Sequence, residues 1–69
     1  MKDIKIRDYI INNFKDDNTS ELKQTIEDTI NEGLEEALPG LGVFMEIIWK
    51  NANDDLKKEL LEILKVHLN

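Results

Sequence analysis

The sequence predicts an all-α fold, a compact bundle of four short helices around a central apolar helix at about residues 39–51. Three observations predict it. Apolar residues recur at intervals of three and four on both sides of the centre, capping residues or glycine fall at helix ends, and the centre itself is apolar on nearly every side. At 69 residues we expect one small domain, residues 1–69, whose core is limited by its size.

The first helix is predicted from about Asp3 to Phe14. Its apolar residues fall within one half of a helical wheel, namely Ile4, Ile6, Ile10, Ile11 and Phe14. Arg7, the only arginine of the chain, projects into the middle of that half. We expect its guanidinium to reach water past a packed stem or to pair with a carboxylate from another helix, and an anion-binding role is the alternative.

The second helix is predicted from Thr19 to Glu32. Asn18 and Glu21 form a variant of the capping box, in which each side chain satisfies a free backbone amide of the other residue. Gly33 is placed to end the helix, since glycine accepts the left-handed backbone of a C-terminal cap. The apolar stripe of this helix consists of Leu22, Ile26 and Ile30.

The central helix begins with a proline and two glycines. Pro39 suits the first helical position, where its missing amide costs nothing, and it biases Leu38 toward an extended backbone. Gly40 and Gly42 weaken the first turn but allow another backbone to come close. We therefore predict tight packing at these two glycines, and Pro39, Gly40 and Gly42 are candidate structural or interaction residues.

The rest of the central helix is apolar around most of its circumference. Glu46 and Lys50, four residues apart, are expected to pair along its one polar edge. A segment of this length is too short to span a bilayer, which needs about 20 residues, so we expect no membrane contact. Protein must cover it, either the other helices or a second copy of the chain. The candidate interaction residues are Phe44, Ile48 and Trp49.

A final helix is predicted from Asp54 to Leu68. Asn53 serves as its N-cap, and the acids in its first turn complement the helix dipole. Its broad apolar face consists of Leu56, Leu60, Leu61, Ile63, Leu64 and Leu68.

The composition argues against several classes of partner. The formal charge of −6 repels phosphate backbones, and the basic residues are scattered among acids, so nucleic acid is not the expected partner. In acid the carboxylates become neutral and the chain becomes strongly cationic, which favours solubility at low pH. The absence of cysteine, and of a secretion signal at the start, suits a reducing compartment inside the cell.

No set of residues has the pattern of a catalytic or metal site. Four residues match the spacing of a calcium-binding loop, but Glu21 stands where that loop needs glycine, and capping explains the same segment. His67 is the only histidine, and its expected role is packing or interaction with the end of its helix. We therefore expect no enzyme activity, no cofactor and no metal. The four residues of the calcium-like spacing are Asp16, Asn18, Ser20 and Glu27.

The run from Gly33 to Ala52 contains Leu-Pro-Gly-Leu-Gly-Val followed by Phe-Met and Glu-Ile-Ile-Trp. This run closely resembles the type I small, acid-soluble spore proteins of endospore-forming bacteria. The resemblance extends to Ile6-Arg7 and to Glu21-Leu22 with Thr25-Ile26. It implies a minor protein made in the developing forespore and kept in the spore core. The glycine-rich, DNA-binding segments of the abundant spore proteins have no counterpart here, so DNA protection is not implied.

These observations lead to one expected function and two alternatives. We expect a non-enzymatic spore-core protein that acts through protein association, with a homodimer or another spore protein as its partner. The first alternative is nucleic-acid binding assisted by divalent cations that screen the acidic surface. The second is small-molecule binding in a closed apolar pocket near Trp49, with Arg7 among its polar groups.

Overall fold

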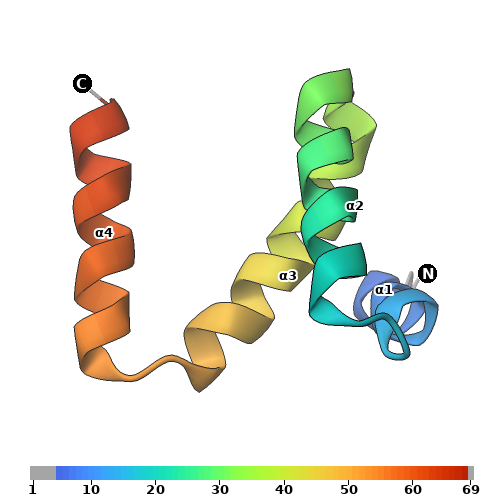
Figure 1. The fold of residues 1–69 in the computed structure, drawn as a ribbon, viewed down its shortest axis with the longest axis horizontal. Coiled ribbons are helices and arrows are strands. Elements are labelled where there is room, and N and C mark those ends of the chain that lie inside the picture. The colour runs from blue at the N-terminus through green and yellow to red at the C-terminus, as the bar shows by residue number, and fades with distance from the viewer. Residues whose placement is uncertain (1–4, 69) are drawn as a thin grey trace.

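The computed structural model describes residues 5–68, and this part of the chain is all-helical. The four α-helices are α1 (Ile6–Phe14), α2 (Thr19–Glu32), α3 (Leu38–Asn51) and α4 (Asp54–Leu68), and a 3₁₀ turn, η1 (Glu35–Ala37), leads into α3. The predicted fold class is therefore confirmed. Figure 1 shows α1, α2 and the start of α3 together on one side, with the rest of α3 leading across to α4.

The helix ends confirm the predicted caps. The Glu21 amide donates to Asn18 Oδ1 at 2.8 Å, and the Asn18 amide donates to Glu21 Oε1 at 2.9 Å, which completes the capping box of α2. Gly33 ends that helix in the left-handed conformation, at φ 67°. At α4, the Leu56 amide donates to Asn53 Oδ1 at 2.8 Å. Both of these helices have the bounds that the sequence predicts.

The structure departs from the prediction at two helix starts. The first helix begins at Ile6 rather than Asp3, and Asp3 and Ile4 lie outside the described residues. Leu38 is helical (φ −59°, ψ −38°), so the expected extended backbone before Pro39 is wrong. The reason is that η1 runs directly into α3, which makes Leu38 the first α3 residue and Pro39 the second. Pro39 still lies in the first turn, where a missing amide is tolerated.

The packed part of the molecule lies where α1 meets α3. Val43 is the only buried apolar side chain among residues 5–68, with 8% of its surface exposed. Phe14 and Phe44 meet edge to face, their ring centroids 5.3 Å apart and their planes at 80°. Gly40 faces α1 closely, because a Cβ added there would lie 3.4 Å from Ile10 Cδ1. These contacts fix α1 against the first half of α3.

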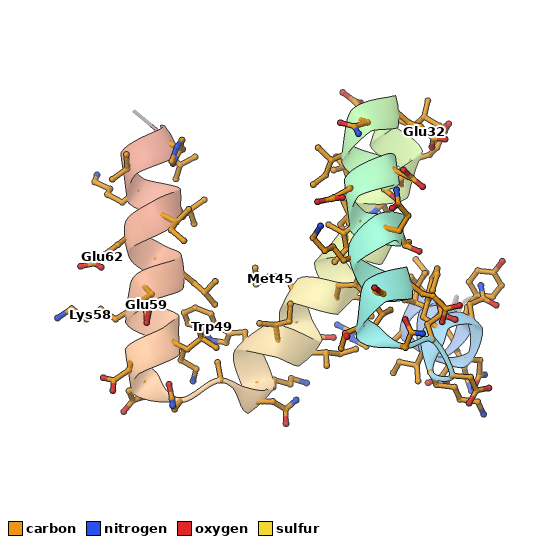
Figure 2. The ribbon with its side chains drawn as sticks, in the orientation of Figure 1. Glu32, Met45, Trp49, Lys58, Glu59 and Glu62 are labelled. Carbon is orange, nitrogen blue, oxygen red and sulfur yellow. The ribbon has the colours of Figure 1, made fainter. Side chains whose placement is uncertain are left out.

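Helix α4 stands apart from α1 and α2 (Figure 1). Ala52 is extended (φ −81°, ψ 147°), and the Asn53 cap then starts α4 in a new direction. The Lys57 ammonium lies 5.3 Å from the centre of the Trp49 ring, so the base of α4 is attached to the end of α3. Figure 2 shows Lys58 and Glu62 pointing away from α3, while Trp49 reaches toward α4.

The single chain is open, and the compact bundle predicted from the sequence is not what it shows. Its radius of gyration is 13.5 Å, whereas a compact chain of this length has about 11 Å. Its accessible surface is 5957 Å², against about 4,450 Å² for a typical folded monomer of 8.0 kDa. Phe44 is half-buried against Phe14, but Ile47 and Ile48 remain exposed. The central helix is therefore covered on one side only.

Candidate functional site

An apolar hollow of about 240 Å³ lies between α1, α2 and α3, and we call it the apolar hollow. Lys15 is the only charged residue at its wall. The small-molecule hypothesis expected a closed pocket near Trp49 that includes Arg7, and neither residue lines this hollow. The lining residues are Ile10, Ile11, Phe14, Lys15, Leu22, Ile26, Phe44, Ile47 and Ile48.

A second apolar surface runs along α4. Five of its six residues are exposed, and Leu60 is half-buried. Because Lys58 and Glu62 point away from α3 (Figure 2) and lie across the helix from Leu60 and Leu64, most of this surface is turned to the α3 side, and Leu61 lies at its border beside Lys58 and Glu62. We call it the α4 apolar face, and it consists of Leu56, Leu60, Leu61, Ile63, Leu64 and Leu68.

Arg7 joins α1 to α3 through Glu46. Its Nε donates to Glu46 Oε1 at 2.6 Å, and its Nη2 donates to Oε2 at 3.0 Å, which is the two-pronged geometry that favours arginine over lysine. Pairing with a carboxylate of another helix was one of the two expected arrangements, and it is confirmed. Glu46 was expected to pair with Lys50, but among the ion pairs of the described chain its partner is Arg7.

The ion pair shifts the protonation of both partners toward their charged forms. The hydrogen bond from Arg7, followed by smaller effects of its charge and of Lys50, holds the pKa of Glu46 below its ordinary value. The same hydrogen bond and the charge of Glu46 raise the pKa of Arg7. The Arg7 side chain is nevertheless 69% exposed and that of Glu46 30%, so water weakens the attraction. The pair orients α1 and α3 more than it stabilises them.

The two glycines of the central segment differ in what surrounds them. Close approach is found at Gly40, where the neighbour is a side chain of α1 rather than another backbone. At Gly42 an added Cβ would meet nothing within 4 Å, so the expected tight packing there is wrong. Sequence patterns alone do not distinguish the two positions, since which glycine faces α1 depends on how the helices cross.

The described residues contain no group of three or more acidic, histidine or cysteine side chains that could hold a metal ion. In the segment with calcium-like spacing, Asn18 caps α2. His67 Nδ1 donates to the Ile63 carbonyl at 2.9 Å, within the last turns of α4, as expected for a histidine near a helix end. Within residues 5–68, none of the helices has the length and apolar character that crossing a bilayer requires.

Comparison with known proteins identifies the family. A sequence model of the family described as small, acid-soluble spore protein I matches residues 4–68. The chain belongs to the small, acid-soluble spore protein I family. A family member from Bacillus velezensis is 41% identical over 63 residues, which cover 91% of this chain and 89% of the relative. Members from Bacillus cereus and Bacillus anthracis are each 43% identical over 60 residues, or 87% of both chains. No solved structure matches the chain.

Membership of this family confirms the resemblance that the run from Gly33 to Ala52 indicates. The family is named for a protein of the spore, and its name refers to no catalysed reaction. The relatives match the chain nearly from end to end, so the helices around the apolar hollow and α4 both belong to the shared region.

Proposed function

We propose that this member of the small, acid-soluble spore protein I family is a non-enzymatic component of the spore core that acts by binding another protein. The observation behind the proposal is the uncovered apolar surface. Val43 is the only buried apolar side chain of residues 5–68, while the apolar hollow and the α4 apolar face are both open. Large exposed apolar patches on small proteins are typical of interaction sites, because leaving them in water is unfavourable.

The character of the two surfaces supports a protein as the partner. At about 240 Å³ the apolar hollow is smaller than most drug-sized ligand sites, which begin at about 300 Å³. Insertion of a few apolar side chains from an amphipathic helix suits such a groove. Arg7 and Glu46, the charged pair between α1 and α3, satisfy one another and leave no convergent polar groups in the hollow wall.

Crosslinking inside intact spores tests the proposal. A photoreactive amino acid replaces Ile48, in the hollow wall, or Lys58, which points outward from α4 (Figure 2). We expect a protein adduct from the Ile48 position and much less from the matched Lys58 position. Equal yields from both positions, or no protein adduct at all, would contradict binding through the apolar surface.

Fractionation of the same spores tests the location. We expect the tagged protein in the core fraction after the coat has been removed chemically. Recovery of most of the protein with the coat would contradict the spore-core assignment and leave the binding test unaffected.

A further inference from the structure

Two apolar surfaces of this chain are complementary in shape and have no partner within the described residues. The apolar hollow is concave and is built by three helices, and the α4 apolar face is a convex ridge along one helix. We propose that each α4 apolar face fills the apolar hollow of a second copy, so that two chains exchange their last helices in a closed dimer. This inference rests on the proposed protein-binding function and names its partner.

The connection between α3 and α4 explains why the chain does not fill its own hollow. Ala52 is extended, the Asn53 side chain caps the Leu56 amide at 2.8 Å, and Lys57 lies over Trp49. Together they fix the direction in which α4 leaves α3, away from α1 and α2 (Figure 1). None of the residues in these contacts lines the apolar hollow, so filling the hollow does not require them to change.

The exposed area agrees with what a stable dimer needs. The chain exposes 5957 Å², about 1,500 Å² more than a typical folded monomer of its mass. A standard protein interface buries about 800 Å² on each partner. The extra exposed area of each chain is therefore large enough for an interface in which the two chains of a dimer exchange their last helices.

Symmetry makes the arrangement finite. The α4 apolar face and the apolar hollow lie on different parts of the chain. A contact between two different surfaces can in general continue from chain to chain into a filament. If each of two chains inserts its α4 into the other, the two contacts are related by a twofold axis and every hollow is filled. The proposal therefore predicts a dimer with no larger assemblies.

The oligomeric state of the full chain is the first test. By size-exclusion chromatography with light scattering, we expect twice the chain mass of 8.0 kDa at micromolar concentrations. Leu64→Glu, at an α4 position 52% exposed within the single chain, should weaken the dimer at least about 30-fold, because it buries a charge at the contact.

Each surface has a matched control variant. Val66→Glu introduces the same charge on α4, at a residue 68% exposed that lies beside Lys58 and Glu62, and should leave the dimer intact. On α1, Ile11→Glu in the hollow wall should weaken the dimer, and Tyr9→Glu outside it should not. Circular dichroism of the monomeric variants tests whether their helices remain formed, and we expect that they do.

Disulfide trapping then identifies which surfaces meet. Because the chain contains no cysteine, Ile11→Cys and Leu64→Cys can be made singly and mixed under an added oxidant. We expect a covalent dimer from the mixture, and little from either variant alone or from mixed Tyr9→Cys and Val66→Cys. Efficient linkage of Leu64→Cys with itself would overturn the exchange in favour of direct contact between two α4 helices.

The outcomes separate this inference from the proposed function. A strict monomer at high micromolar concentration overturns the exchange, while an adduct to a different protein from the Ile48 position in spores still supports protein binding. In a chain that carries both Ile11→Cys and Leu64→Cys, an intrachain disulfide in a monomer would show that α4 folds back onto its own hollow. That result would overturn both proposals, because the apolar surface would then be covered.

Discussion

The unit formed by α1, α2 and α3 differs from α4 in how each is held. In the first, side chains distant in sequence meet, as Phe14 does with Phe44 and Arg7 with Glu46. The second is attached to the end of α3 at its base, where Asn53 caps the helix and Lys57 contacts Trp49. A strongly amphipathic sequence is therefore not by itself evidence that a helix is buried within its own chain.

The largest expected difference between the two parts is in the effect of removing an apolar side chain. Phe44→Ala should lower the free energy of unfolding by about 2–3 kcal/mol, less than for a fully buried phenylalanine because this ring is half-buried. Leu64→Ala should change it by less than about 0.5 kcal/mol in the monomer, since 52% of the surface of Leu64 is already exposed.

Urea unfolding measures both variants at a protein concentration at which light scattering shows the chain to be a monomer. A similar loss of unfolding free energy in Phe44→Ala and Leu64→Ala would show that α4 packs onto the α1–α3 unit in solution, as in the compact bundle predicted from the sequence. It would remove the basis of the comparison, because α4 would then share one core with the other helices.

The same contrast explains how much of the structure could be predicted from the sequence. Helix positions depend on local signals, and Asn18, Gly33 and Asn53 marked the ends of α2 and the start of α4 correctly. The apolar stripes also identified the surfaces that require covering. Local signals were misleading at Leu38, where the 3₁₀ turn η1 carries the helical path into Pro39.

What could not be predicted is how the helices are arranged in space. The direction of α4 depends on two backbone angles at Ala52, and nothing in that residue's identity determines them. The apolar hollow likewise needs residues from α1, α2 and α3 at once, so Ile11, Leu22 and Ile26 could not be singled out beforehand. The choice of Glu46 as the partner of Arg7 depends on the crossing of α1 and α3, whereas sequence spacing pointed to Lys50.

The two glycines of α3 offer a smaller test within the packed part. Gly42→Ala should raise the free energy of unfolding by about 0.5–1 kcal/mol, because alanine favours the helix and the added methyl group meets nothing. Gly40→Ala should raise the free energy of unfolding less, since its Cβ would lie 3.4 Å from Ile10 Cδ1, at the short end of van der Waals contact, and Ile10 must adjust to it. Thermal unfolding of both variants measures the difference, and a larger gain at Gly40 would mean that α1 does not pack against it.

The smallest expected effect concerns the pH dependence of the contact between α1 and α3. The folded pKa of Glu46 lies below its ordinary value, so its pairing with Arg7 stabilises the fold fully above that ordinary value and is lost as pH falls through the folded pKa. The raised pKa of Arg7 acts in the opposite sense and matters only at extreme alkaline pH.

Glu46→Gln should therefore reduce the acid dependence of stability between about pH 5 and 3, the range in which glutamates titrate. Glu27→Gln is the control, because Glu27 pairs with Lys23 of the same helix at 3.2 Å and does not join two helices. Chemical unfolding at a series of pH values measures both variants. Equal flattening by the two would mean that the contact between α1 and α3 is no more sensitive to acid than a pair along one helix.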